Sequence, residues 1–357
     1  MNKQSFSTNN PLVSILILTY DRTDLLKSCL ESVLKIKYSN LEFIVSDNGS
    51  VENISLFVSK NFPRKKIKVV RLVENRGLTG GFNYGFKFCK GKYTMVLSND
   101  TKIDENAVSF MVDMAEKDPS IGIISPQIIQ MRNPKLLHNA GSFLTYTGFL
   151  YHYGILKSKS SSYYQKNYYI FSCNGAGFLI RREAAKKSGL FEEDFFYFYD
   201  DSDLSHRMWL SGHTVVYCAE AKLWHLWSAT MQGTNNRIWY YNHRNHISSF
   251  IVNLSLPYLL LILVNFNLML LFWFVMNICK LKFDVAITLP KAYLWHIINI
   301  KKTLERRNFI QNEIRQVSDS EIFKKCLVSP NLEYYLMYLH FKNKDYKLPN
   351  RVMYKKI

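Results

Sequence analysis

The sequence lacks the paired cysteines that mark a disulfide framework or a zinc site. Its six cysteines are scattered and none belongs to a CxxC motif: Cys29, Cys89, Cys173, Cys218, Cys279 and Cys326. This pattern is typical of a protein in a reducing compartment. A secretory signal is missing as well, because the polar start MNKQSFSTNN is followed by an apolar run, VSILIL, that is too short for one. We therefore expect the catalytic part of the chain to be cytoplasmic.

Acidic residues are the second shortage. The 357 residues include 28 Asp and Glu against 46 Lys and Arg, which gives a formal net charge of +18. This balance favours an anionic partner, which could be nucleic acid, an acidic membrane surface or a phosphate-bearing substrate. The positive charges are dispersed and no nucleic-acid recognition motif is present, so we expect no nucleic-acid partner. The oligomeric state stays open.

Short apolar runs alternate with helical patterns in the first part of the chain. The runs predict buried strands at 13–18, 41–45, 67–73 and 93–97, and the patterns between them predict helices at 24–36 and 78–89. Further strands are predicted at 177–180 and 214–218, and a helix at 203–210. Alternation of this kind predicts an α/β fold with a mostly parallel sheet and helices on both faces.

Each of the first four predicted strands ends in polar, turn-forming residues that include a carboxylate. The four ends read TYDR at 19–22, DNGS at 47–50, ENRG at 74–77 and SNDT at 98–101. In open α/β sheets, ligands bind outside the carboxyl ends of the strands. Any one of these loops could be polar only because it is a loop. The recurrence at four consecutive ends favours a binding site.

The most unusual segment is 173–213, which combines a glycine turn, two arginines and a dense cluster of acids and aromatic rings. Burying carboxylates beside rings is costly unless the acids do chemistry or bind a cation. The acids stand before a predicted helix, whose N-terminus lowers their pKa values, whereas neighbouring acids and rings raise them.

The composition changes near residue 250. Residues 254–279 hold no charge and, as a helix, would reach about 39 Å, enough to cross a bilayer. Basic residues follow, and residues 283–300 form a second amphipathic stretch with Trp295. A simple crossing would place these charges outside, so we expect a helix that lies in, or re-enters, the cytoplasmic face of the membrane. A buried core helix is the alternative.

The motifs VSILILTYDR, FIVSDNGS, ENRGLTGGFNYGFK and LSNDT, followed by the segment 173–213, resemble the family 2 glycosyltransferases with the GT-A fold. The likeness covers about residues 11–247 and is nearest to the bacterial rhamnosyltransferase-like branch. It implies a Rossmann-like GT-A domain at 1–250, membrane-associated helices at 251–300 and a basic helical tail at 301–357. It also implies an inverting transfer of sugar from a dTDP- or UDP-sugar, rhamnose-like by preference, to a lipid-linked saccharide. O-antigen or capsule synthesis is the expected setting.

The resemblance assigns donor-binding roles position by position. Thr19, Tyr20 and Asp21 match nucleotide contacts after the first strand, and Asp47 matches the acid that accepts a hydrogen bond from the pyrimidine. For Asp47, stabilisation of the DNGS turn is the alternative. Further matches are to the glycine-rich stretch and the residues near the diphosphate: Asn75, Arg76, Gly80, Gly81, Asn83, Asn99 and Asp100. Tight helix packing would explain the glycines equally well.

A divalent cation, Mg²⁺ or Mn²⁺, is the cofactor that the resemblance implies. The family's DXD-like triplet reads Ser98-Asn99-Asp100 here and keeps one carboxylate. Asp100 would bind the cation together with diphosphate oxygens and water, and His225 matches a histidine that supplies a ligand in many relatives. A core role for His225 is the alternative.

The catalytic acids are expected in the pair Asp200-Asp201. Asp201 matches the family's catalytic base, and Asp200 would bond the acceptor or hold Asp201 in place. Asn174, Gly175 and Tyr199 are expected on the acceptor side. Arg244, in YYNHRNHI, is a candidate contact to the diphosphate, with helix surface charge as the alternative. Because the metal triplet has lost one acid, a catalytically weak or inactive scaffold is the second hypothesis for the chain.

Overall fold

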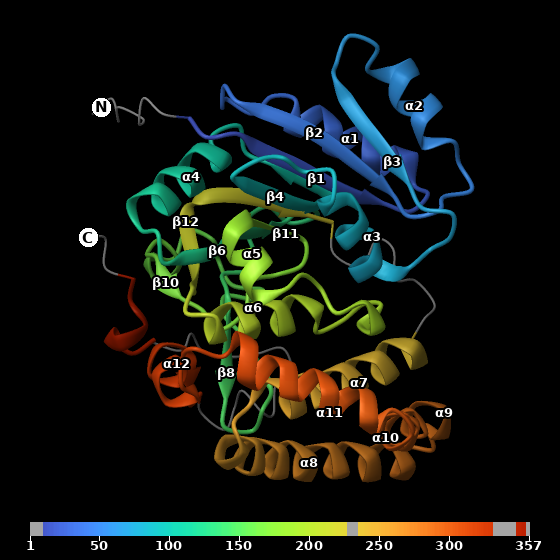
Figure 1. The fold of residues 1–357 in the computed structure, drawn as a ribbon, viewed down its shortest axis with the longest axis vertical. Helices are drawn as coiled ribbons and strands as arrows, with labels where there is room; N and C mark the ends of the chain where they lie inside the picture. The colour runs from blue at the N-terminus through green and yellow to red at the C-terminus, as the bar shows by residue number, and fades with distance from the viewer. Residues whose placement is uncertain (1–9, 227–234, 331–347, 355–357) are drawn as a thin grey trace.

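The computed structural model describes residues 10–226, 235–330 and 348–354 (Figure 1). Its centre is a mixed sheet in the order β10-β12-β6-β11-β4-β1-β2-β3, with β5 paired to β12 and β7 to β6. A second sheet has the order β13-β8-β9. Two apolar cores fill the two faces of the large sheet, one under α1, α2 and α4 and the other under α3, α5 and α6.

The first part of the chain is the predicted alternation of strands and helices. Its elements are β1 Val13–Thr19, α1 Thr23–Val33, β2 Leu41–Asp47, α2 Ile54–Asn61, β3 Ile67–Arg71, α3 Gly77–Phe86 and β4 Tyr93–Ser98. The four strands are parallel and neighbouring in the order β4-β1-β2-β3. The third strand ends two residues earlier than predicted, and Val73 beyond it is 99% exposed.

The second part of the chain makes the sheet mixed. Its elements are β5 Thr101–Ile103, α4 Ala107–Lys117, β6 Ile121–Gln130, β7 Leu137–Asn139, β8 Ser142–Thr145, β9 Leu150–His152, β10 Tyr168–Tyr169, β11 Gly177–Arg181, α5 Arg182–Ser188, α6 Asp200–Leu210 and β12 Thr214–His225. Strand β11 runs antiparallel to both β4 and β6. Strand β12 extends seven residues past its predicted end and pairs with β5, with His225 opposite Thr101.

These two strands bring later parts of the chain to the carboxyl ends of the first four. Because β11 is antiparallel to β4, its first residue, Gly177, lies opposite Leu97 near the end of β4. The turn before β11 therefore lies beside the SNDT loop, where the amide of Ser98 donates to the carbonyl of Ala176 at 3.0 Å. The end of β12 reaches the same loop, since the amide of Leu226 donates to the carbonyl of Asp100 at 3.0 Å.

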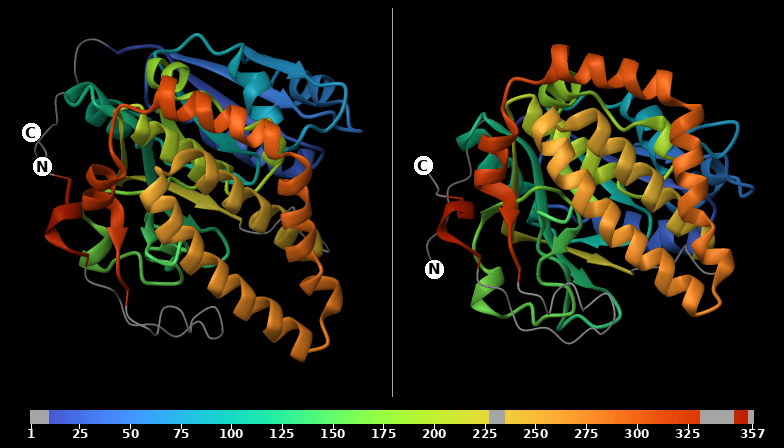
Figure 2. Two further views of the ribbon diagram at one scale, coloured as in Figure 1. Left: turned by 60° about the horizontal axis from the view of Figure 1, so that its bottom comes forward. Right: turned by 90° about the horizontal axis from the view of Figure 1, so that it is seen from below.

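The C-terminal region is a group of helices packed on the α6 side of the sheet (Figure 2). Its elements are α7 Asn235–Asn253, α8 Leu256–Cys279, α9 Phe283–Ala286, α10 Thr288–Ile298, α11 Ile300–Phe309, a π-helical turn Ile310–Ile314, α12 Asp319–Cys326, β13 Leu327–Val328 and a short 3₁₀ turn Asn350–Val352. Part of the predicted tail at 301–357 lies outside the described residues. The described part packs against the rest of the fold, where β13 pairs with β8 and Asp319 is buried.

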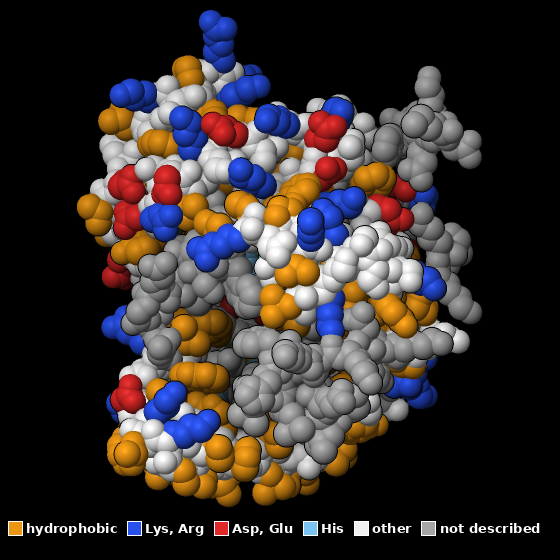
Figure 3. Space-filling view, turned by 180° about the vertical axis from the view of Figure 1, so that it is seen from behind, with side chains coloured by type: hydrophobic (Ala, Val, Ile, Leu, Met, Phe, Trp, Pro, Cys, Tyr) orange, Lys and Arg blue, Asp and Glu red, His pale blue; other side chains and the backbone are white. Residues whose placement is uncertain are grey.

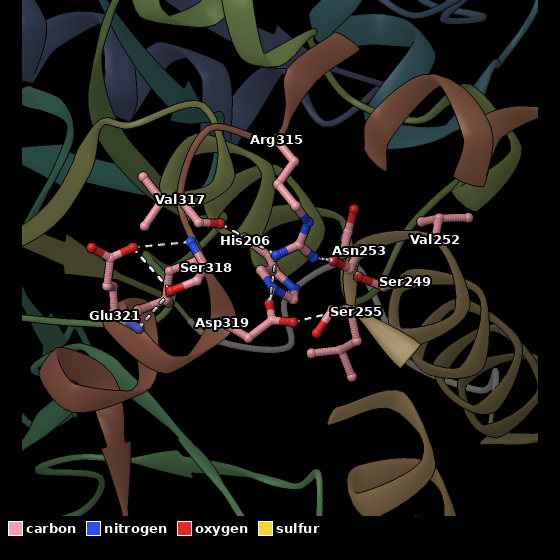
Figure 4. A network of polar contacts seen from close by, with 12 residues as sticks. His206, Ser249, Val252, Asn253, Ser255, Arg315, Val317, Ser318, Asp319 and Glu321 are labelled. Atoms are coloured by element: carbon pink, nitrogen blue, oxygen red, sulfur yellow. Dashed lines mark hydrogen bonds and ion pairs between the residues drawn. The ribbon is translucent and has the colours of Figure 1, made fainter. Parts of the chain in front are cut away.

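A polar network fastens the last helices to the rest of the fold (Figure 4). Asp319, at the start of α12, accepts hydrogen bonds from the amide of Ser255 at 2.7 Å and from Nη1 of Arg315 at 3.2 Å. Arg315 also donates to the carbonyl of Asn253, the last residue of α7. The network closes the α7–α8 turn against α12.

Helix α8 is apolar and mostly exposed. It is the one described helix that is long and apolar enough to cross a membrane, and 17% of its most apolar window is buried. Its buried residues, Ile262, Phe266 and Leu270, are spaced four apart and so form a single stripe toward the protein. A core helix would be covered all round, so this is not the burial predicted by the core-helix alternative. Figure 3 shows hydrophobic side chains gathered at that end of the molecule.

Candidate active site

The carboxyl ends of β1, β2 and β4 meet at one edge of the sheet. Thr19, the last residue of β1, lies opposite Asp47, the last residue of β2. Asn99, just after β4, donates from Nδ2 to Oγ1 of Thr19 at 2.9 Å. All three residues are buried. The fold thus brings together three of the residues predicted to bind the donor, and we call these strand ends and the start of α3 the donor side.

The carboxylate of Asp47 is held from two directions. Oδ1 accepts a hydrogen bond from the amide of Ser50 at 2.9 Å, which is the turn-stabilising role left open by the sequence. Oδ2 lies 3.2 Å from Nη1 of Arg71, at the end of β3. The pyrimidine contact of Asp47 stays a prediction, and Arg71 is a partner that the sequence did not indicate.

The loop after β1 is tied to the loop after β2. Asp21 has a left-handed backbone, φ 49°, and its Oδ1 accepts hydrogen bonds from the amides of Val51 at 2.7 Å and Glu52 at 3.2 Å. Its own amide donates to Oγ of Ser50 at 2.8 Å. Asp21 therefore stabilises the two loops through these hydrogen bonds. Tyr20, in contrast, is 45% exposed.

Asn48 organises the start of α3. Its Nδ2 donates to Oδ1 of Asn75 and to the carbonyl of Gly77, both at 2.9 Å, and its Oδ1 accepts from the amide of Arg76 at 3.1 Å. The guanidinium of Arg76 pairs with Glu193 at 2.7 Å. Both side chains of that pair are about half exposed, so an incoming diphosphate would have to compete only with a solvated ion pair.

The glycines of α3 serve packing as well as access. A Cβ on Gly81 would lie 2.4 Å from Cδ1 of Leu18, so the packing alternative holds at that position. A Cβ on Gly80 would meet only the side chain of Arg76. Gly77 has φ +70°, and a Cβ there would lie 2.3 Å from the carbonyl oxygen of Phe196. Asn83 bonds Phe191 in both directions, from Nδ2 to its carbonyl at 2.8 Å and to Oδ1 from its amide at 3.1 Å.

Asp100 and His225 face each other. Nε2 of His225 lies 3.3 Å from Oδ2 of Asp100, and Nδ1 of His225 lies 3.0 Å from Nδ1 of His138 on β7. Burial lowers the pKa of His138 to about 3, so this ring is neutral at pH 7. Among the described residues, no group of three or more His, Cys, Asp and Glu side chains could hold a metal ion. A cation here would therefore take further ligands from substrate or water.

Asp201 stands at the start of α6 and reaches the turn before β11. Its Oδ2 accepts a hydrogen bond from the amide of Gly175 at 2.7 Å, and its Oδ1 accepts from Oγ of Ser202 at 3.1 Å. Burial raises the pKa of Asp201, although the Gly175 amide opposes the rise. Desolvation is therefore the largest influence on this pKa, and it acts in the direction expected from the neighbouring rings.

Asp200 and Tyr199 lie beside Asp201 and are both buried. Oδ2 of Asp200 and the hydroxyl of Tyr199 find no hydrogen-bond partner among the residues that the structure describes. Burial, together with the charge of Asp201, raises the pKa of Asp200 well above its ordinary range. Asn174 caps its own turn through Oδ1 and the amide of Ala176 at 3.0 Å.

Helix α6 begins three residues before its predicted start. Tyr199 has a left-handed backbone, φ 60°, and its carbonyl accepts the first helical bond, from the amide of Asp203 at 2.9 Å. Both acids of the pair therefore belong to the first turn. Phe196 and Phe198 precede them with φ 64° and 67°. We call the loop 195–199 and the start of α6 the base side.

Arg244 is buried, and its partners are backbone carbonyls. Its Nη2 donates to the carbonyls of Asp194 and, at 3.1 Å, Phe195, and its Nε donates to Oδ1 of Asn245 at 2.9 Å. Its burial excludes the surface charge considered as the alternative from the sequence. The diphosphate contact of Arg244 stays a prediction.

Four residues of this edge were not singled out from the sequence: Asn48, Arg71, His138 and Ser202. Asn48 belongs to the DNGS motif, and Ser202 directly follows the pair Asp200-Asp201, so their neighbours could have indicated them. His138 and Arg71 carry no local signal, because only the pairing of β7 with β6 and of β3 with β2 brings them to the site.

Comparisons with known proteins bear on the family and the fold. Residues 14–189 match the family model described as glycosyl transferase family 2. The poly-beta-1,6-N-acetyl-D-glucosamine synthases of Staphylococcus aureus and Staphylococcus epidermidis are each 26% identical over 223 residues, which is 62% of this chain and 51% of theirs. The chain thus spans about half the length of these curated relatives.

Solved structures resemble the fold at low sequence identity. GalNAc-T7, solved with UDP, GalNAc and Mn²⁺, has a TM-score of 0.56 at 17% identity, over 71% of this chain and 49% of that one. The mannosyltransferase PcManGT of Pyrobaculum calidifontis, in complex with GDP-Man and Mn²⁺, has a TM-score of 0.53 at 16% identity, over 84% and 79%. These likenesses show the GT-A fold. Residues 14–189 thus match glycosyl transferase family 2, on a chain with the GT-A fold.

Proposed function

We propose that the chain is an inverting glycosyltransferase, in which Asp201 takes the proton from an acceptor hydroxyl. The observation that carries this proposal is the position of Asp201. Its carboxylate is fixed by the amide of Gly175, in the turn that lies beside the SNDT loop, and that loop reaches Thr19 and Asp47 through Asn99. A base, a diphosphate site and a nucleoside site along one sheet edge are the parts that this reaction needs.

The donor is a nucleoside-diphosphate sugar in this proposal. Tyr20 is exposed to stack on the base, and Asp47 would turn an acceptor oxygen toward the N3–H of uracil or thymine. The family resemblance favours a rhamnose-like dTDP-sugar, whereas the curated relatives are named as synthases of an N-acetylglucosamine polymer. Both sugars belong in the donor screen.

Asp100 and His225 fit a divalent cation. Two ligands at right angles on one cation, each about 2.1 Å from it, lie about 3 Å apart. The observed separation of 3.3 Å between Nε2 and Oδ2 is close to that value. When bound, Mg²⁺ or Mn²⁺ would neutralise charge on the leaving diphosphate. His138, neutral and in contact with Nδ1 of His225, fixes the orientation of that ring.

The apolar face of α8 supports attachment to the cytoplasmic face of the membrane. It exposes Leu260, Val264 and Leu268 along one side, and α10 adds Ile297 and Ile298. The stretch that follows α8, residues 280–302, exposes five lysines: Lys280, Lys282, Lys291, Lys301 and Lys302. An exposed apolar face together with exposed lysines fits an anionic bilayer, in or on which a lipid-linked saccharide would be presented.

The membrane contact is tested with vesicles. The variant Leu260→Asp, Val264→Asp, Leu268→Asp is expected to lose sedimentation with vesicles that contain anionic phospholipid. Val73→Asp, which changes an exposed valine just beyond β3, is the control and should sediment like the wild type. Equal sedimentation of all three proteins would contradict the proposal.

The activity is tested by release of nucleoside diphosphate from a panel of dTDP-, UDP- and GDP-sugars with Mn²⁺ or Mg²⁺. We expect release from at least one donor, and a fall of about 10²- to 10⁴-fold in transfer to a lipid-linked acceptor for Asp201→Asn. Asp113→Asn, at a surface ion pair of α4, is the matched control. Release from no donor would instead favour the inactive scaffold that the reduced metal triplet raised.

A further inference from the structure

The loop that delivers Asp200 and Asp201 has a strained backbone. Phe196, Phe198 and Tyr199 all have positive φ, at 64°, 67° and 60°, and none of them is glycine. Aromatic residues in this region cost about 1–3 kcal/mol each and persist only where surrounding contacts hold them. The loop would therefore relax, and move the two acids, unless something outside it fixes its carbonyls.

Asn245, on α7, provides such a contact. Its side-chain Nδ2 donates to three carbonyls of the loop, those of Phe195 at 3.0 Å, Tyr197 at 2.9 Å and Phe198 at 2.7 Å. Two N–H bonds serve three acceptors, so at least one hydrogen bond is shared. The Asn245 side chain is fully buried, so water does not compete for its amide hydrogens.

Arg244 completes the grip at the start of the loop. It donates to the carbonyls of Asp194 and Phe195, and it is bonded to the side-chain oxygen of Asn245 at 2.9 Å. Oδ1 of Asn245 is thereby occupied, which leaves its Nδ2 directed at the loop. Together the two residues bond the carbonyls of residues 194, 195, 197 and 198. The carbonyl of Phe196 has another partner.

That partner is on the donor side. The carbonyl of Phe196 accepts from the amide of Leu78 at 2.7 Å, in the first turn of α3. The loop is therefore held between the helix of the glycine-rich stretch and α7. Gly77 allows this approach, because a Cβ there would lie 2.3 Å from the same carbonyl oxygen.

The C-terminal helices support the clamp from behind. The ring of Trp295, on α10, lies 4.9 Å from the Arg244 guanidinium, and Nε2 of His296 lies 3.0 Å from the Arg244 carbonyl. From α11, Lys302 pairs with Asp194, and Arg306 pairs with Glu192 at 2.7 Å. Helix α10, which adds Ile297 and Ile298 to the exposed apolar face, is thus also a helix that contacts Arg244.

We propose that Arg244 and Asn245 are positioning residues, which hold the 195–199 loop in its strained form so that Asp201 meets the amide of Gly175. This inference rests on the proposed function, in which Asp201 is the base. It replaces the diphosphate contact predicted for Arg244 with a role on backbone carbonyls. A base misplaced by about 1 Å costs about a hundredfold in rate, without a matching loss of donor binding.

The first test does not depend on turnover. Amide hydrogen exchange is measured on the full-length protein for wild type, Asn245→Ala and Asn245→Asp. We expect exchange in residues 199–203 to rise at least about tenfold in both variants, while β1 and β2 stay unchanged. Asn236→Ala is the control, since this asparagine lies on the same helix and bonds Asp284 instead. Wild-type exchange in Asn245→Ala would overturn the proposal.

The second test separates positioning from phosphate binding. With a turned-over donor, Asn245→Ala and Arg244→Lys should lower kcat about 10- to 100-fold while the donor KM and the affinity for free nucleoside diphosphate change less than about twofold. The acid limb of kcat should also move to lower pH, because water that reaches Asp201 reverses part of the pKa rise caused by burial. Loss of diphosphate affinity with unchanged kcat would return Arg244 to the predicted phosphate contact.

Failure of the proposed function is distinguishable from failure of the clamp. A wild type that releases nucleoside diphosphate from no donor refutes the enzyme activity, and the exchange comparison then decides the clamp alone. If Asn245→Asp does not fold, as judged by its melting curve, Asn245→Ala and Arg244→Lys carry the test, since neither places a negative charge against the three carbonyls.

Discussion

On the donor side, each strand end lies next to its neighbour because parallel strands share a register, whereas on the base side Asp201 is placed by contacts with distant helices. Thr19 and Asp47 are the last of seven consecutive pairs of residues that lie opposite each other in β1 and β2. Asp203, two residues after Asp201, is bonded by Arg306, 103 positions away. Regular pairing makes the donor side insensitive to any single side chain. The base side depends on a few buried polar groups, so single substitutions there should have larger effects.

The largest effect on stability is expected from Asp203→Asn. Burial raises the pKa of Asp203, but Arg306 and Arg207 outweigh it and the pKa lies below the ordinary value. The substitution leaves the buried Arg207 without its anion and removes one of the two anions of the partly buried Arg306, which should lower the free energy of unfolding by about 3–5 kcal/mol in urea titrations at pH 7.

The pH dependence of the free energy of unfolding tests the same ion pairs of Asp203. A lowered pKa contributes stability that is present above the unfolded pKa, about 3.9, and is lost as the pH falls through the folded value. The difference between wild type and Asp203→Asn should therefore shrink below pH 4. For comparison, Asp113→Asn removes an exposed pair with Lys117 on α4 and should cost less than about 1 kcal/mol. Equal costs at the two sites would remove the contrast between the two regions.

The next effect concerns cation dependence. His138→Phe removes the partner of His225 Nδ1 and should raise the half-saturating Mn²⁺ concentration about 10- to 100-fold, with little change in melting temperature. His213→Phe, whose ring bonds Ser211, serves as the control. Unchanged Mn²⁺ dependence in His138→Phe would place the cation away from His225.

The pH profile of kcat reports the base side directly. Because burial raises the pKa of Asp201, the acid limb should lie above the ordinary carboxyl value of about 3.9. Activity then falls as the pH decreases through that raised pKa, since the base must be ionised. A limb at or below pH 3.9 would contradict a desolvated base.

The smallest effect is expected on the donor side. Arg71→Met removes the partner of Asp47, but the arginine side chain is about half exposed, so the loss should be below about 1 kcal/mol, or at most a fivefold rise in donor KM. Lys68→Met, on the same strand, should leave KM unchanged. A rise far beyond fivefold would show that the donor side is as sensitive as the base side.

Much of the donor side could be read from residue patterns. The β-branched run of β1 and the polar ends after β1, β2 and β4 required only the periods of strand and helix and the rule that parallel strands end together. The antiparallel β11 and the long β12 could not be anticipated, because a strand of five residues carries no sign of its direction. That direction brings Gly175 to Asp201, and the extra length of β12 brings His225 to Asp100.

The amino-acid sequence by itself determined the α/β class, the apolar helix at Leu256–Cys279 and the acids available for chemistry, since these depend on local periodicity and residue type. Only the tertiary structure decided that Arg244 and Asn245 bond backbone carbonyls of the segment leading to the base. The same holds for the contact of His138 with His225. Such pairs are separated by about fifty positions or more, and a buried polar group takes whichever partner the packing of distant helices and strands leaves within reach.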